Sequence, residues 1–175
     1  MVAESVVERL ERAADRDAAR WAAHDVARVA VDDAVVVTPG SAAWVVAAVR
    51  RLIEDGTPWR ADAFAVLIYV LDHNRVYREL RAETRTYRGQ WKFGIDEEEA
   101  VERALNGFDT VVRNMLDDLD PETRSLAAVL LARISSEPDA DRELMLMLAE
   151  ADSNERVRAT LMGAPREWRW PAEEF

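Results

Sequence analysis

Apolar residues recur at helical spacing along most of the chain. Between residues 96 and 119 they fall at steps of one, three and four, which places them on one wide stripe of an α-helix. The acids at 96–99 suit the positive end of a helix dipole, and Asp96 and Glu99 stand in a capping-box-like order. The pattern therefore predicts a helix across 96–119. Its apolar stripe consists of Val101, Ala104, Leu105, Phe108, Val111, Val112, Met115, Leu116 and Leu119.

The same periodicity predicts further helices, and turn residues mark several of their starts. Asp120–Pro121 and Thr57–Pro58 each read as an N-cap followed by proline at the first helical position. A short helix is expected at 142–151. Val35–Val37 could form a strand, but with no second β-run to pair with, it is interpreted as an extended connector. Two more apolar stripes are Val45, Ala48, Val49 and Leu52, and Phe64, Leu67, Ile68 and Leu71.

Two stretches of the chain repeat one another at an offset of 34 residues, measured from Asp118 to Asp152. In both stretches the Asp precedes an Arg by six positions, and an apolar helical pattern follows. Two looser copies lie upstream, where an Asp precedes an Arg by five positions. The Asp–Arg pairs of the four copies are Asp15 and Arg20, Asp55 and Arg60, Asp118 and Arg124, and Asp152 and Arg158.

This pattern resembles the HEAT repeat, a pair of antiparallel helices joined by a short turn. The turn of that family carries an Asp, and its second helix opens with Val-Arg or a similar pair. Thr123–Arg124 and Val157–Arg158 occupy that place here. The layout is also similar to HEAT-like proteins of actinobacteria. The resemblance implies an all-α, armadillo-like solenoid of about four antiparallel hairpins in one domain, residues 1–175, and it implies no activity.

Each hairpin is too small to bury its own apolar face, so the hairpins are expected to stack, with polar outer faces on the end units. Glu4, Glu8, Glu11 and Arg12 supply such a face at the start. A capping segment is expected at about 164–175. There, Trp168 and Trp170 are predicted to fold over the last apolar face.

Charge is distributed unevenly along the chain, whose formal net charge is -11. Residues 1–73 carry 8 basic and 12 acidic groups and residues 96–175 carry 9 and 20, whereas residues 74–95 carry 6 and 2. An acidic surface repels phosphate backbones, which disfavours nucleic acid as a partner. Basic proteins are its natural electrostatic partners. The expected partner is therefore another protein.

The basic stretch at about 74–95 falls where the repeat spacing widens to 63 residues, between Asp55 and Asp118. We interpret it as a helix extension and loop inserted into the array, and insertions in solenoids often form a binding face. Two readings stay open: a solvated helix face, or a recognition surface for an acidic or phosphate-bearing partner. Arg with Trp is typical of interface hot spots. The predicted partner-binding residues are Arg75, Arg78, Arg81, Arg85, Arg88, Trp91 and Lys92.

No motif of the sequence indicates catalysis or a cofactor. There is no cysteine, and His24 and His73 are too far apart for an HExxH zinc motif. His73 is expected at the end of a helix, where a weak interaction with the helix dipole is a sufficient explanation for it. The glycines form no phosphate- or nucleotide-binding loop. The Asp pairs of the chain are interpreted as helix caps instead of metal ligands, since none continues into an EF-hand loop. These pairs are Asp15 and Asp17, Asp118 and Asp120, and Asp139 and Asp141.

No apolar run approaches the roughly 20 residues of a membrane helix, and the start lacks signal-peptide features, so a cytoplasmic location is expected. The sequence thus predicts a non-catalytic protein-protein interaction module, of an immunity or adaptor type that masks a partner's surface. The alternative is a nucleic-acid-acting HEAT-like enzyme of the alkylpurine DNA glycosylase type. That class needs a basic groove, which the charge of this chain opposes.

Overall fold

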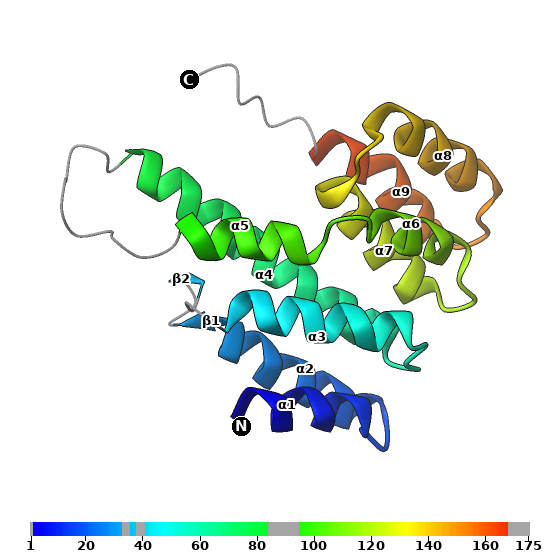
Figure 1. Cartoon of the computed structure of the whole chain (residues 1–175). Helices are drawn as coiled ribbons and strands as arrows, with labels where there is room; N and C mark the ends of the chain where they lie inside the picture. The colour runs from blue at the N-terminus through cyan, green and yellow to red at the C-terminus, as the bar shows by residue number, and fades with distance from the viewer. Residues whose placement is uncertain (1, 33–35, 38–40, 84–94, 168–175) are drawn as a thin grey trace. The chain divides into compact units, whose positions relative to one another are not determined.

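The computed structural model describes residues 2–32, 36–37, 41–83 and 95–167, and the side chains of 6–31, 41–75 and 99–164 (Figure 1). Over these residues the chain is all-α apart from one two-residue β-ladder, which confirms the all-α part of the predicted fold class. The chain divides into two compact units, Met1–Asn106 and Gly107–Phe175. Each unit is described by itself. That they form one solenoid domain over 1–175 stays a prediction.

The first unit contains five helices among its described residues: α1 (Val2–Glu11), α2 (Arg16–Ala30), α3 (Ala42–Glu54), α4 (Arg60–Glu83) and α5 (Ile95–Ala104). Helix α1 packs on α2, α3 packs on α4 and α5, and α2 lies against α4 (Figure 1). Asp15 begins α2 as its N-cap, because its carboxylate accepts a hydrogen bond of 2.8 Å from the Ala18 amide. Large core side chains come from every pair of packed helices and include Leu10, Val26, Val45, Phe64 and Leu67.

The second unit contains α6 (Asp109–Asn114), the 3₁₀ turn η2 (Met115–Asp117), α7 (Pro121–Ile134), α8 (Pro138–Ala151) and α9 (Glu155–Glu167). Helix α7 packs against α6, η2 and α9, and α8 packs against α9. Asp120 caps α7 by accepting from the Thr123 amide at 3.0 Å, with Pro121 as the first helical residue, which confirms that predicted start. The core of this unit is formed by Phe108, Leu116, Leu130, Leu131, Met145 and Leu161.

The predicted single helix over 96–119 is wrong, because the structure breaks it between α5 and α6. Gly107 has a φ of +72°, a left-handed conformation that glycine adopts without steric cost. Phe108 follows at once and is fully buried, so the apolar stripe continues as far as Leu116 although the helix does not. Leu119, the last residue of the predicted stripe, is instead 98% exposed. Asp96 also lies inside α5 instead of capping it, since that helix begins at Ile95.

Three other local predictions differ from the structure. Helix α4 begins at Arg60 instead of Pro58, because the Thr57 hydroxyl accepts from the Trp59 amide at 3.2 Å and forms a turn before the helix. His73, expected at a helix end, lies inside α4. The Val35–Val37 connector does find a partner: β2 (Val36–Val37) pairs antiparallel with β1 (Val31–Asp32), since α2 ends beside it in extended backbone.

The structure describes only part of the two predicted end caps. The side chains of Glu8, Glu11 and Arg12 at the end of α1 are exposed, as a polar outer face requires. Trp168 and Trp170, with the rest of 168–175, lie outside the described residues.

Candidate functional site

The two best repeat copies have the same local geometry in the second unit. Asp118 lies in the turn between η2 and α7, and Asp152 lies in the turn between α8 and α9. Arg124 and Arg158 stand in the first turns of the helices that follow, as predicted. In each copy the guanidinium Nη1 donates to the carbonyl oxygen of the repeat Asp, at 2.7 Å for Arg124 and 3.0 Å for Arg158. The sequence repeat is therefore a structural repeat.

An ion pair links the two copies. Arg124 Nε and Nη2 donate to the two carboxylate oxygens of Asp152 at 2.8 and 3.1 Å, in the bidentate geometry that strengthens such pairs. The side chains are only 14% and 9% exposed. The hydrogen bond from Arg124 lowers the pKa of Asp152, with a smaller contribution from the Asn154 amide. Because Asp152 accepts from Arg124 as well as from the Asn154 amide, it holds the two repeat copies together.

A second buried network uses a residue that the sequence reading assigned to a helix cap. Asp141 lies in the first turn of α8, but it is buried and pairs with Arg113 at 2.5 and 3.0 Å instead of capping the helix. The Ser135 hydroxyl also donates to Asp141 at 2.6 Å. Nearby, a hydrogen bond from the Ser136 hydroxyl lowers the pKa of Asp109, and the bond to Asp141 raises the pKa of Arg113. These carboxylates are engaged in structural bonds, and within the described ranges no group of three or more potential ligands could hold a metal ion.

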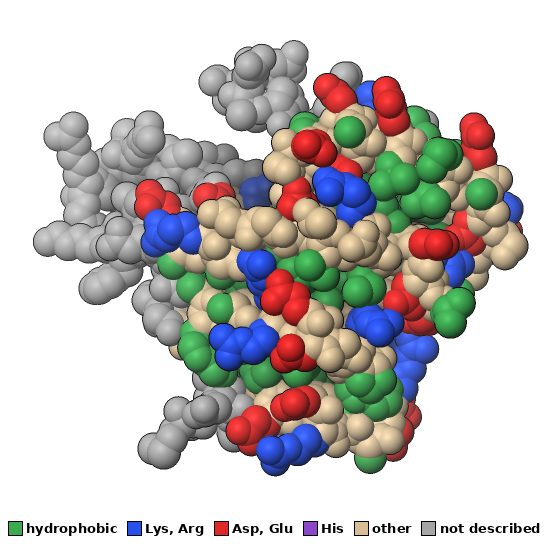
Figure 2. Space-filling model, turned by 45° about the vertical axis from the view of Figure 1, so that its right-hand side comes forward, with side chains coloured by type: hydrophobic (Ala, Val, Ile, Leu, Met, Phe, Trp, Pro, Cys, Tyr) green, Lys and Arg blue, Asp and Glu red, His purple; other side chains and the backbone are tan. Residues whose placement is uncertain are grey.

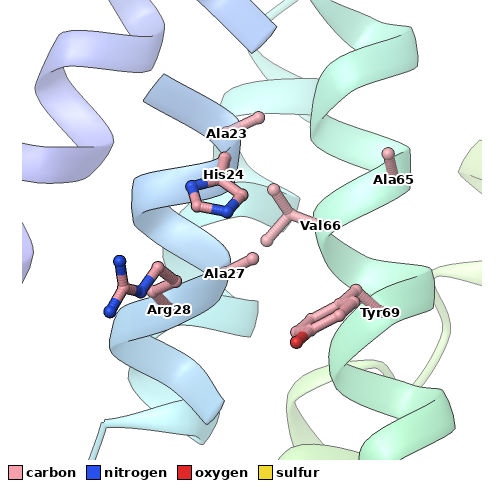
Figure 3. A pocket seen from close by; sticks show the side chains of 7 residues that line it. All are labelled: Ala23, His24, Ala27, Arg28, Ala65, Val66 and Tyr69. Carbon is pink, nitrogen blue, oxygen red and sulfur yellow. The ribbon is translucent and has the colours of Figure 1, made fainter. Parts of the chain in front are cut away.

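An open hollow of about 260 Å³ lies between α2 and α4, here called the α2–α4 hollow. Figure 3 shows Ala23 and Ala27 pointing from α2 toward α4, and Val66 and Tyr69 pointing from α4 toward α2. The alanines leave the space, because larger side chains at those positions would fill it. The full lining is Ala23, His24, Ala27, Arg28, Ala65, Val66 and Tyr69.

Polar and aromatic groups surround the apolar floor of this hollow. The Tyr69 ring lies 4.1 Å from the ring of His73, and His73 Nδ1 donates to the Tyr69 carbonyl oxygen at 2.8 Å, which fixes both residues on α4. On α2, the Trp21 ring meets His24 edge-on at 6.4 Å between centroids, and Trp21 is 72% exposed. Leaving so large an apolar ring in water is costly, and Trp is enriched at protein interfaces.

The exposed side of α2 also carries a row of basic residues that sequence reasoning missed. We call the row the α2 ridge: Arg16, Arg20, His24 and Arg28, each four residues after the last and each exposed. At 100° per residue they span an arc of about 120°. The signal was present in the regular spacing, but it was hidden in the net acidic balance of residues 1–73.

The residues of the α2 ridge differ in how far they are already engaged. Arg16 and Arg20 have interactions within the protein. Arg28 has no ion-pair partner among the residues whose side chains are described, and Figure 3 shows its guanidinium on the side of α2 away from Tyr69. Asp25, the nearest acid on the helix, is occupied by Arg9 at 2.9 Å. Arg28 is therefore the ridge cation most available to a ligand.

The structure describes only the first of the partner-binding side chains that were predicted from the sequence. Arg75 is exposed on α4 and has an interaction within the protein. Arg78 and Arg81 belong to α4, as predicted, but their side chains are not described. The remaining members, which are Arg85, Arg88, Trp91 and Lys92, lie outside the described residues. This predicted surface stays a prediction.

Charges on the face drawn in Figure 2 are mixed, with acidic, basic and hydrophobic side chains interspersed over the described residues. None of the described helices is long and apolar enough to cross a membrane. The α2–α4 hollow, with Trp21 and the α2 ridge beside it, is thus the best-defined candidate site in the described part of the chain. No protein-family model and no curated protein sequence matches this chain.

Proposed function

We propose that this protein is a non-catalytic module that binds another protein, built from stacked HEAT-like helical hairpins. The observation that carries the proposal is the exposed Trp21, whose ring meets that of His24, a residue that lines the α2–α4 hollow. A protruding aromatic ring next to a depression with an apolar floor is the arrangement in which interface hot spots form. The module would act as an adaptor or immunity-type protein by covering the surface of its partner.

The size of the hollow supports a protein side chain as its occupant over a metabolite. Sites for small molecules usually measure about 300–1,000 Å³ and enclose most of the ligand. The α2–α4 hollow lies near the lower end of that range, at about 260 Å³, and its open shape would leave much of a small molecule in solvent. It matches one or two side chains of a docked segment, whose remaining surface would lie on α2 and α4.

The nucleic-acid-acting alternative receives less support from the described residues. The buried carboxylates Asp109, Asp141 and Asp152 are each engaged by hydroxyl or guanidinium donors. The net charge of -11 also opposes a phosphate backbone. The predicted basic stretch at about 74–95 remains a second proposed contact surface for the same protein partner.

The proposal is tested by comparing α2–α4 variants with matched variants of α3. Trp21→Ala removes the exposed ring and Ala65→Phe fills the hollow from an exposed position. The controls are Trp44→Ala, which removes a ring that is 39% exposed, and Ala47→Phe at another exposed alanine. Trp21, Ala65 and Ala47 lie at solvent-exposed positions, where effects on stability are usually within about 0.5 kcal/mol. Trp44→Ala also removes packing from a ring that is mostly buried, so it is expected to cost more, and thermal unfolding measures all four effects.

The readout is quantitative crosslinking and capture from an extract of the native cells. We expect one specific protein to be captured by the parent and by both α3 variants. The amount of this protein that is captured should fall by about tenfold or more with Trp21→Ala and with Ala65→Phe. Equal capture by all five proteins would refute the α2–α4 face as the contact surface. If the parent captures no protein above a scrambled control, the interaction function itself fails.

A further inference from the structure

The α2 ridge runs beside the α2–α4 hollow, and together the two features define the chemistry of a ligand. The ridge presents basic side chains at intervals of four residues, which are about 6 Å apart along a helix. The hollow adds an apolar floor from Ala23, Ala27 and Val66 (Figure 3). A complementary segment carries acids at similar intervals on one side and small or aliphatic side chains on the other.

On this basis we infer that the α2–α4 face binds an acidic amphipathic helix of a partner protein, with a carboxylate of that helix on Arg28. The inference rests on the proposed protein-binding function and specifies the partner's chemistry. The apolar side chains of the helix enter the α2–α4 hollow against Val66 and Tyr69. Its acids lie over the α2 ridge, where Arg28 offers a guanidinium without an ion-pair partner among the described side chains.

Electrostatics favour a carboxylate segment over nucleic acid at this face. Duplex DNA carries one negative charge per roughly 1.7 Å of its axis, so the long-range repulsion from a protein of net charge -11 is large. A short acidic helix carries far fewer charges and meets the local cations directly. The carboxylate also fits the planar fork of Arg28 in the bidentate geometry that Arg124 and Asp152 show in the second unit.

Tyr69 adds a directional contact at the edge of the hollow. Its ring is held against His73, and Figure 3 shows its hydroxyl extended toward α2. A phenolic hydroxyl can donate to a carboxylate or a backbone carbonyl of the docked segment. Tyr69→Phe removes only this hydroxyl and leaves the ring contact, so it separates hydrogen bonding from packing.

The experiment uses a defined probe, which is a labelled peptide of about 15 residues. It carries Glu at every fourth position along one face of a helix and Leu on the opposite face, and it is long enough to form a helix on binding. Its control is the same peptide with Gln in place of Glu. The fluorescence anisotropy of the labelled peptide, titrated with the 175-residue protein, gives the dissociation constants. The key pair of variants is Arg28→Glu and Arg51→Glu. Arg51 on α3 is also exposed and also without an ion-pair partner among the described side chains, so both changes lower the net charge equally.

We expect the Glu peptide to bind the parent about tenfold more tightly than the Gln peptide, and more weakly as salt is raised. The affinity for the Glu peptide should fall about tenfold with Arg28→Glu, about threefold with Tyr69→Phe, and less than about twofold with Arg51→Glu. Equal binding of both peptides, equal losses with Arg28→Glu and Arg51→Glu, or no saturable binding of the Glu peptide would each overturn the inference. Tighter, Arg28-dependent binding of a single-stranded oligonucleotide would do the same. Native-partner capture that still depends on Trp21 would then leave the protein-binding function standing with a partner of different chemistry.

Discussion

Removing the guanidinium of Arg124 should destabilise the second unit by more than an ordinary surface ion pair would. Arg124→Ala deletes two hydrogen bonds to the Asp152 carboxylate and the bond to the Asp118 carbonyl. It also leaves a carboxylate that is only 9% exposed without its cation. Breaking a buried pair costs about 3–5 kcal/mol, and hydrogen bonds to charged groups contribute roughly 1.5–3 kcal/mol. Asp152 still accepts from the Asn154 amide at 2.8 Å, so we expect a loss of about 2–4 kcal/mol.

The control for this experiment is an ion pair of similar length on the surface. Arg103 donates to Glu99 at 3.2 Å, four residues apart on α5, and both side chains are more than half exposed. Arg103→Ala should change stability by less than about 1 kcal/mol. Urea unfolding followed by circular dichroism at 222 nm measures both variants under the same conditions. A loss below about 1 kcal/mol for Arg124→Ala, or equal losses for the two variants, would refute the assigned role of the pair.

The effect should also depend on pH in a defined direction. Arg124 lowers the pKa of Asp152 in the folded protein relative to the unfolded chain. The stabilisation is therefore complete above the unfolded value of about 3.9 and is lost as pH falls through the folded value. The difference in unfolding free energy between parent and Arg124→Ala should narrow below about pH 4. A difference that stays constant down to about pH 3 would contradict this account.

Three further predictions test separate features. Gly107→Ala should cost about 1 kcal/mol through its left-handed φ of +72°, whereas Gly163→Ala inside α9 should stabilise by about 0.5–1 kcal/mol, both by urea unfolding; opposite signs are required. Asp141→Ala should destabilise by roughly 3 kcal/mol or more, because it strands Arg113 beside a buried site, and a double-mutant cycle with Arg113→Ala should recover part of the loss. Replacing four arginines of the predicted basic surface with Gln should leave the thermal midpoint nearly unchanged but reduce partner capture if that surface takes part, and unchanged capture would exclude it. These four are Arg78, Arg81, Arg85 and Arg88.

The features that the sequence predicted well depend on bonds between residues close along the chain. The Asp120 cap spans three residues, so its spacing alone predicts it. The six-residue spacing from Asp118 placed Arg124 in the first turn of its helix, and the structure adds the bond from Arg124 to the Asp118 carbonyl. The link from Arg124 to Asp152 spans 28 residues. The sequence analysis did not predict this link, although the repeat it found is what aligns the two turns.

The features that the sequence did not predict depend on tertiary burial or on averaging. Asp141 looks like a helix-start acid, and only packing against Arg113 reveals that it is buried. The apolar spacing across this region fits one helix, but the chain is interrupted at Asn106–Gly107. The left-handed backbone conformation of Gly107 ends the helix although the side-chain pattern would allow it to continue. The α2 ridge was missed because charge was summed over long segments, which conceals a basic row on one side of one helix.

The ion pair between Arg124 and Asp152 joins two repeat copies in a way that a further copy can extend. Of these two copies, the first contributes Arg124 and the second contributes Asp152 to the pair. Arg158 is the last such arginine, and it bonds to the Asp152 carbonyl while no carboxylate among the described residues pairs with it. A tandem duplication of the 34-residue unit would bring the missing acid with it. A longer form of this protein, evolved or designed, can therefore use the same kind of Arg–Asp ion pair between its added copies.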